Sequence, residues 1–163
     1  MKNSIIIFFA FFGTYINAQT LPNFDLIKLE KKSDYKAAEP FVLQTANYLL
    51  SSPFKKDNPD RLSSLRFIGK WIYGTTDYSI VINDAGDKIG KDNNDLLGIY
   101  MAAMVKYTLE NKTASKDAKL VKLNALILLL NYCGNKDNNI KMTKQLKKLS
   151  EEKEKGQLTI ENL

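Results

Sequence analysis

The sequence LVKLNALILLL at residues 120–130 is apolar on nearly every side when it is drawn as a helix. A helix of this kind is stable only when neighbouring elements cover it on several sides. Ser115 and Asp117 precede it as capping residues, and Gly134 follows it as a residue that ends helices. This stretch therefore predicts a buried helix, and the fold depends on the elements that cover it.

Four further helices are predicted from apolar residues that recur at spacings of three and four. Asn58-Pro59-Asp60 supplies one of them with a capping side chain, a proline at the first position and an acidic first turn. The predicted spans are about 37–50 (or from Ser33, with a disturbance at Pro40), 59–74, 95–111, and a C-terminal helix that Asp137-Asn138 caps and that points Met142, Leu146 and Leu149 inward.

Five helices with short connections predict an all-α fold, either a bundle or a stack of antiparallel helical hairpins. The length of 163 residues suits one domain, which we place at residues 33–155. Residues 19–32 are expected to form an exposed lead-in, and residues 156–163 a flexible tail.

One long, partly extended loop is predicted at residues 75–95. Tyr78, Ile80 and Ile82 alternate with polar or smaller residues, as in a strand with one buried face. Three large apolar side chains are costly to leave in water. We therefore expect these three to pack against the helices near Trp71, with the stretch 84–95 outside.

The N-terminus has the order of a secretory signal peptide. Lys2 precedes the apolar run Ile5–Phe12, and smaller residues lead to a predicted cleavage point at Ala18-Gln19. The apolar run is about half the roughly 20 residues that a membrane span needs, and no cysteine follows it as a lipid acceptor. Residues 1–18 are therefore interpreted as a signal peptide, and the mature protein is expected to be periplasmic or secreted, without a membrane span or lipid anchor.

The composition excludes several kinds of chemistry. The chain has no histidine and one cysteine, which excludes Ser-His-Asp and Cys-His catalysis and histidine-ligated metals. Neither a cofactor nor a metal site is expected. An exported protein with a lone cysteine has no partner for an intrachain disulfide, so Cys133 is interpreted as a small buried apolar residue.

The carboxylates form no recognisable catalytic or metal-binding pattern. Asp84, Asp87, Asp92 and Asp95 gather near the long loop, but the pattern of a calcium-binding EF-hand is absent. Turn formation and helix capping explain them. Asp77 and Glu39 are isolated acids, and a hydrolase would need two such groups to converge in a cleft.

The net charge of +6 raises nucleic acid as a partner. Only two of the 24 basic residues are arginine, Arg61 and Arg66, whereas nucleic-acid sites favour arginine interleaved with aromatic residues. The lysines on the C-terminal helix are therefore interpreted as a solvated face: Lys141, Lys144, Lys147 and Lys148. No nucleic-acid partner is expected.

A group of aromatic and polar residues marks the end of the second predicted helix. Trp71, Tyr73, Asp77 and Tyr78 surround the point where that helix gives way to the loop. They are the candidate binding residues, forming an aromatic-walled site for a peptide or glycan. The structural alternative is that the loop folds back as a lid over the helix ends and buries its aromatic side chains.

Two patterns of similarity bear on the fold. At one constant offset, Tyr48, Leu50, Ile68, Trp71 and Tyr73 align with Tyr107, Leu109, Ile127, Leu130 and Tyr132, as in a duplicated helical hairpin. The segments 41–53, 67–78 and 95–103 together resemble an uncharacterised family of small exported α-helical proteins of Gram-negative bacteria. This resemblance implies a helical, exported protein and brings no activity, cofactor or site residue with it.

The sequence thus predicts a non-enzymatic interaction module that binds a protein or peptide in the cell envelope. Two alternatives stay open. One is a carboxylate-dependent hydrolase acting on glycans or peptides, and the other is an inhibitor or immunity-type protein.

Overall fold

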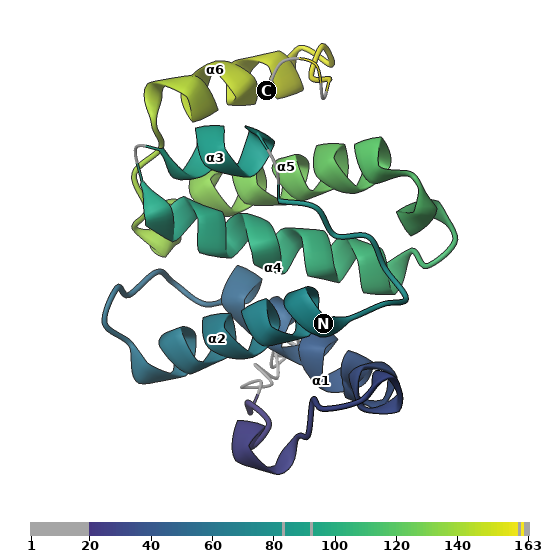
Figure 1. Cartoon of the computed structure of the whole chain (residues 1–163). Helices are drawn as coiled ribbons and strands as arrows, with labels where there is room; N and C mark the ends of the chain where they lie inside the picture. The colour runs from purple at the N-terminus through teal and green to yellow at the C-terminus, as the bar shows by residue number, and fades with distance from the viewer. Residues whose placement is uncertain (1–19, 83, 92, 160, 162–163) are drawn as a thin grey trace, which may run out of the picture.

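Helix α4 (Asn94–Glu110) runs through the middle of the molecule and packs against α1, α2, α3 and α5 (Figure 1). The computed structural model describes residues 20–82, 84–91, 93–159 and 161, so the predicted signal peptide and its cleavage point lie outside the described residues. The α-helices are α1 (Lys32–Ser51), α2 (Pro59–Gly74), α3 (Asp84–Gly90), α4, α5 (Ala118–Gly134) and α6 (Lys144–Glu154). Short 3-10 turns are η1 (Phe24–Leu26), η2 (Ala114–Lys116) and η3 (Lys136–Asn138). The described residues contain no strand, which confirms the predicted all-α fold.

Two of the predicted helix starts are confirmed in atomic detail. The Asn58 side chain accepts a hydrogen bond of 2.8 Å from the Arg61 amide, and Pro59 occupies the first turn of α2. The Asp117 side chain accepts from the amides of Lys119 and Leu120 at the start of α5. These side chains satisfy amides that have no partner within the helix.

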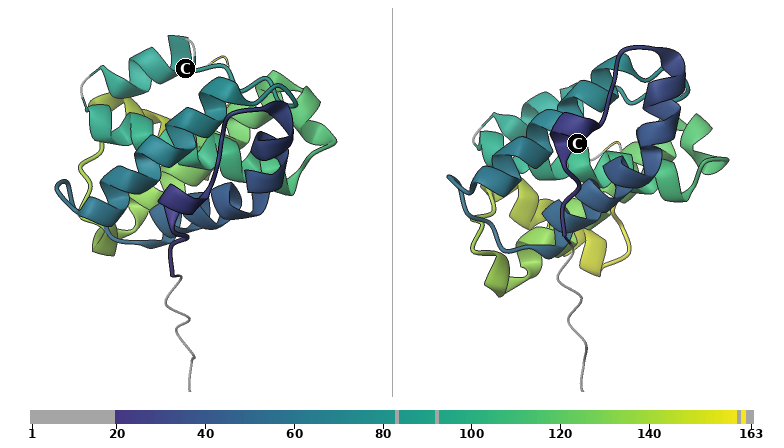
Figure 2. Two further views of the ribbon diagram at one scale, coloured as in Figure 1. Left: turned by 60° about the horizontal axis from the view of Figure 1, so that its bottom comes forward. Right: turned by 90° about the horizontal axis from the view of Figure 1, so that it is seen from below.

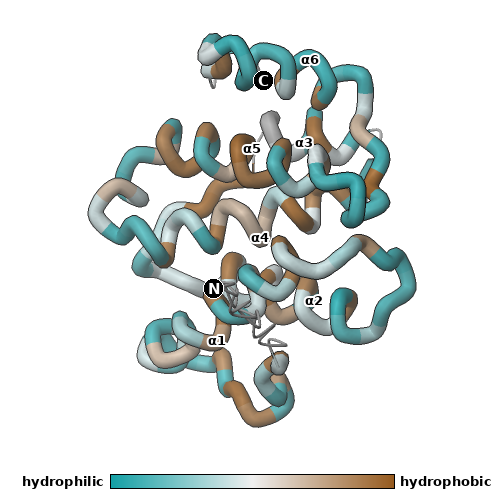
Figure 3. The backbone as a smooth tube through the Cα atoms, turned by 180° about the vertical axis from the view of Figure 1, so that it is seen from behind, coloured by the Kyte–Doolittle hydropathy of each residue, from teal (hydrophilic) through white to brown (hydrophobic). Residues whose placement is uncertain are grey.

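The hydrophobic core consists of two clusters that meet at α4. One cluster lies between α3, α4, α5 and α6, and α4 contributes Ile99 and Tyr100 to it. The other lies between α1, α2 and α4, to which α4 contributes Ala102 and Val105. Helix α5 carries long apolar stretches, whereas α6 is mostly hydrophilic (Figure 3). The predicted burial of the 120–130 stretch is confirmed on the side that faces α4, where Leu126 and Leu129 are fully buried.

Helices α2 and α4 run in the same direction. The Arg61 guanidinium donates to the Asp95 carbonyl oxygen at 3.4 Å. Leu65 lies against Gly98 one turn further on, and Gly69 lies against Met101 after one more turn. After α2 ends, the chain therefore has to run back along the molecule before α4 can begin. The segment from residue 75 to α3 makes this return (Figure 1).

The predicted long loop is wrong for residues 84–90, which form α3. The Ile89 side chain is only 2% exposed and packs into the first core cluster, so this stretch does not lie outside. Gly86 allows the close approach of Ile82, because a Cβ atom at residue 86 would overlap the Ile82 side chain. The glycines and acids that indicated a turn therefore belong to a short packed helix.

The expected exposed lead-in also needs correction. Residues before α1 cross the surface of α1 and α2 (Figure 2), and the rings of Phe24 and Phe67 lie 4.7 Å apart. The Leu29 side chain is buried in the second cluster. Helix α1 begins at Lys32, close to the alternative start at Ser33 and not at Ala37, and it continues through Pro40.

The C-terminal helix starts later than predicted. Asp137 and Asn138 belong to η3, and the buried Asn138 side chain donates to the Tyr132 carbonyl oxygen at 2.8 Å. The capping residue of α6 is Thr143, whose hydroxyl accepts from the Leu146 amide at 3.2 Å. The predicted inward positions of Leu146 and Leu149 are confirmed.

The helical hairpin formed by α1 and α2 and the one formed by α4 and α5 have matching boundaries. Asn47 and Lys106 lie 59 residues apart, and at that same offset the last residue of α1 falls on the last of α4 and the first of α2 on the first of α5. Matching boundaries agree with the offset at which the sequence aligns with itself. Duplication of a hairpin stays a prediction.

Cys133 is buried and unpaired, and burial raises the pKa of its thiol from 9.0 to about 12. Because the thiolate is the reactive form, we expect the folded protein to react with Ellman's reagent at pH 8 at least about 100-fold more slowly than the protein unfolded in urea. A raised pKa also means that this thiol stabilises the fold below pH 9 and loses that contribution as the pH rises toward 12. Rapid labelling of the folded protein would show that Cys133 is accessible.

No helix among the described residues combines the length and the apolar character that crossing a membrane requires.

Candidate functional site

The four residues that the sequence singled out do not form one open site. Trp71 is fully buried, and its indole nitrogen donates to the Tyr35 carbonyl oxygen at 2.9 Å. The ring of Tyr78 packs 5.9 Å from that of Trp71. Tyr73 points away from both and is 95% exposed. Trp71 therefore has no surface that a ligand can contact. Its position agrees with the alternative interpretation, in which the segment after α2 folds back and the aromatic side chain is buried.

Asp77 and Tyr78 line a polar hollow of about 550 Å³. The hollow lies where the C-terminal end of α2 meets the turn between α4 and α5. Hydroxyl groups and lysines dominate its walls, which are Thr75, Thr76, Asp77, Tyr78, Ser79, Lys112, Ser115, Lys116 and Ala118. We call this set the polar hollow.

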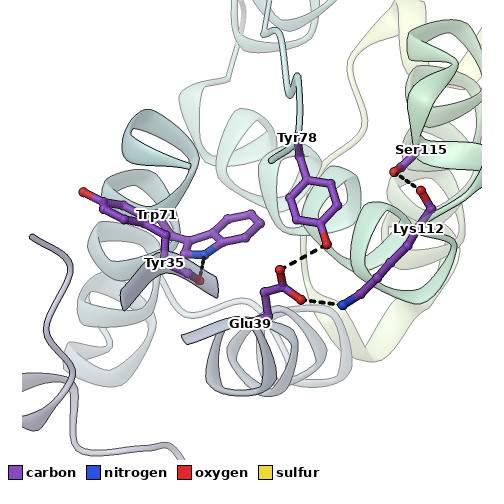
Figure 4. Close-up of polar contacts among 6 residues, drawn as sticks. All are labelled: Tyr35, Glu39, Trp71, Tyr78, Lys112 and Ser115. Carbon is purple, nitrogen blue, oxygen red and sulfur yellow. Dashed lines mark hydrogen bonds and ion pairs between the residues drawn. The ribbon is translucent and has the colours of Figure 1, made fainter. Parts of the chain in front are cut away.

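A buried carboxylate holds the polar hollow together (Figure 4). Glu39 of α1 is 8% exposed and accepts two hydrogen bonds, from the Tyr78 hydroxyl at 3.1 Å and from the Lys112 ammonium at 2.5 Å. This hydrogen bond raises the pKa of Lys112. Burial, and then the charge of Glu39, raises the pKa of Tyr78. Glu39 thereby ties α1 to the segment after α2 and to the end of α4.

The Glu39 arrangement was not foreseen from the sequence. Glu39 and Lys112 are 73 residues apart, and the sequence carries no signal that pairs them. In the sequence Glu39 stands beside Pro40 as an isolated acid. A buried Glu inside an apolar helical face is the one local hint, because such a group needs partners.

The carboxylates give no support to hydrolysis. Asp77 is exposed and pairs with Lys32 at 2.9 Å, and the hydrogen bond from Lys32 lowers the pKa of Asp77. A general acid needs a raised pKa, whereas among the described residues the shifted carboxyl groups, Asp77 and Glu161, both shift downward. Asp87 lies exposed on α3. The described residues also contain no group of three or more acids or cysteines that could hold a metal ion.

The segment 78–82 leads away from the polar hollow and belongs to no helix. Tyr78, Ile80 and Ile82 are half-buried and pack against the core clusters, as predicted. Ser79 and Val81 between them are exposed, which is the alternation of a strand. Within the described part of the chain, residues 78–82 make no backbone–backbone hydrogen bond. We call residues 78–82 the single strand, because their side chains alternate in burial as in a strand although, within the described residues, they pair with no second strand.

A separate apolar groove lies between the lead-in and α1, with a volume of about 480 Å³. Leu26 is 79% exposed and Phe41 42% exposed along it. This groove shares no lining residue with the polar hollow. A peptide could bind in this apolar groove instead of along residues 78–82, so the binding experiments have to distinguish the two surfaces.

Comparison of the chain with known protein families, with curated proteins and with solved structures finds no match, so its function has to be inferred from these sites.

Proposed function

We propose that the protein is a non-enzymatic module that binds an extended peptide segment of another protein along the single strand. The observation that carries the proposal is the set of backbone N–H and C=O groups of residues 78–82, which have no backbone partner among the described residues. An extended peptide can add to such a strand through main-chain hydrogen bonds, a mode that many recognition domains use.

The strand is held ready for a partner by its inward face. Ile80 and Ile82 pack against the core, and the Tyr78 hydroxyl is bonded to the buried Glu39. The inward side chains therefore hold the segment against the helices before any peptide arrives. Ordering a flexible loop on binding costs affinity, so a strand that is already ordered favours a partner.

The polar hollow supplies a place for a side chain of the peptide. Lys112 and Lys116 border it, and Lys116 is exposed without an ion-pair partner among the described residues. Threonine and serine hydroxyls beside them can donate or accept hydrogen bonds. An acidic or hydroxyl side chain at one end of the peptide suits these groups better than an apolar one.

The proposed place of action follows from the predicted signal peptide, which sends the protein to the cell envelope or outside the cell. Binding there to a single target that it blocks would make the protein an inhibitor or immunity-type protein. That alternative differs from the proposal only in the target. The resemblance to small exported helical proteins agrees with this location and stays a prediction.

The proposal can be tested with a random twelve-residue peptide library displayed on phage and selected on the immobilised full chain. We expect enriched peptides that slow hydrogen exchange of alternate backbone amides within residues 78–82, measured by NMR. The matched variants are Val81→Thr, which keeps a β-branched exposed residue, and Val81→Pro, which removes an amide and blocks strand pairing. Affinity should be unchanged in the first and at least about tenfold weaker in the second.

Two outcomes would contradict strand addition. One is that no peptide is enriched. The other is that enriched peptides bind without protecting any amide of residues 78–82, for example by contacting Leu26 and Phe41 in the apolar groove instead.

A further inference from the structure

Asparagines converge on a second hollow, of about 370 Å³, between the C-terminal end of α1, helix α5 and η3. Its walls are Asn47, Leu50, Ser51, Lys106, Leu128, Asn131, Tyr132, Asn135 and Asn138. We call this set the asparagine hollow. None of these residues lines the polar hollow or belongs to the single strand.

The orientation of three of the amides is determined by their partners. Asn47 Oδ1 accepts a hydrogen bond from Lys106 Nζ, and Asn131 Oδ1 accepts one from Lys153 Nζ, both at 2.6 Å. Asn135 Oδ1 accepts from the backbone amide of Asp137 at 3.1 Å. Ammonium and backbone N–H groups only donate, so each amide must turn its oxygen toward them.

The amide nitrogens of these asparagines are consequently left for a ligand. Among the described residues, Nδ2 of Asn47, Asn131 and Asn135 donates no hydrogen bond. Asn131 belongs to the last turn of α5, Asn135 follows directly after that helix, and Asn47 belongs to α1. The hollow thus offers hydrogen-bond donors from two walls.

The remaining walls combine apolar side chains with one lysine, Lys106. Leu50, Leu128 and Tyr132 give the hollow apolar surface. Lys106 pairs with Glu110 at 2.5 Å, so its charge is balanced. The Ser51 hydroxyl donates to the Tyr48 carbonyl oxygen at 3.4 Å and keeps its lone pairs as acceptors.

We propose that the asparagine hollow binds a saccharide unit. Hydroxyl groups of a pyranose accept hydrogen bonds from the amide nitrogens and can donate to an acceptor such as Ser51. The C–H face of the ring matches the apolar side chains of Leu50 and Leu128. A small anion would use the donors, and the Lys153 ammonium beside Asn131 would attract it, but it would leave the apolar walls of the hollow without a role.

The first arm of the test uses the 15N-labelled full chain and needs no variant. Chitotriose, cellotriose and maltotriose are titrated separately, with inorganic phosphate and acetate as anion probes. The side-chain NH2 signals of the three asparagines report on the ligand directly. We expect at least one trisaccharide to shift these signals saturably, with no comparable shift from either anion.

The second arm uses substitutions that keep the structural oxygen and replace the proposed donor with a carboxylate oxygen; the negative charge that each adds is matched in the control variant. The triple variant Asn47→Asp, Asn131→Asp, Asn135→Asp still accepts from Lys106, Lys153 and the Asp137 amide. A matched control carries the same change at three capping asparagines outside the hollow, Asn23, Asn58 and Asn93, whose Oδ1 atoms accept backbone amides. We expect saccharide affinity to fall at least about tenfold in the first triple variant and to stay unchanged in the control.

Three outcomes would overturn the saccharide site: no trisaccharide shifts the NH2 signals at millimolar concentration, an anion shifts them instead, or the triple variant binds as tightly as its control. The melting temperatures of the two triple variants show that both are folded when they are compared. Peptide binding along the single strand is independent of each result.

Discussion

Replacing Trp71 by alanine should lower the free energy of unfolding by about 3–5 kcal/mol, the range for buried tryptophan or phenylalanine. The indole is fully buried in the cluster between α1, α2 and α4. The change leaves a cavity and removes the hydrogen bond to the Tyr35 carbonyl oxygen. For a chain of this size the melting temperature should fall by roughly 10–20 °C, measured by circular dichroism.

Tyr73 provides the matched control, because it lies two residues further along α2 and is 95% exposed. Tyr73→Ala removes an aromatic ring from the same helix without opening a cavity. Its effect on stability should stay within about 0.5 kcal/mol. If both variants melted at the same temperature, the placement of Trp71 in the core would be wrong.

The double change Ile80→Ala, Ile82→Ala should cost about 2–4 kcal/mol in total, less than for fully buried isoleucines because both side chains are half-buried. Ile80 packs against both core clusters. Ile82 packs against the first cluster, which lies between α3, α4, α5 and α6. Losing them should detach the single strand from the helices. We expect the melting temperature to fall by roughly 5–15 °C.

The outward face of the same strand serves as the comparison. Ser79→Ala together with Val81→Ala changes two exposed residues and should leave the melting temperature within about 2 °C of the wild type. A double isoleucine variant as stable as this control would show that the strand is not packed. The amide-exchange test of peptide binding would then lose its structural basis.

Structural features that depend on residues close together in the sequence could be predicted from it. Capping by Asn58 and Asp117 is local, so the starts of α2 and α5 could be predicted closely. Apolar spacing likewise predicted a helix at the position of α4, and the alternation of Tyr78, Ile80 and Ile82 predicted their inward direction.

Prediction failed where packing between distant segments outweighs local preference. Residues 84–90 contain turn-forming residues, yet Ile89 anchors them as a helix against α4. Phe24 and Leu29 make the lead-in part of the core, because Phe67 and the cluster around it lie beside them. Asn138 was assigned to a helix cap, but its side chain bonds to the end of α5 instead.

The candidate sites could be predicted only in part. Asp77 and Tyr78 were recognised and do line the polar hollow, whereas Tyr73 and Trp71 do not. Glu39 and Lys112 come together only through the fold, as do the asparagines of the second hollow, which belong to α1, α5 and η3. The spacing of residues along the sequence does not predict which side chains from distant segments come into contact.

The position of α4 between both hydrophobic clusters determines how the chain can be dissected. A fragment that ends before α4 keeps Val42 and Ile68 but loses Ala102 and Val105, which cover them within one cluster. A fragment that starts at α4 lacks α1 and α2, so Ala102 and Val105 of α4 are exposed to water. Neither hairpin is therefore a separable folding unit. The two halves should melt in one cooperative transition, for which the calorimetric and van't Hoff enthalpies agree.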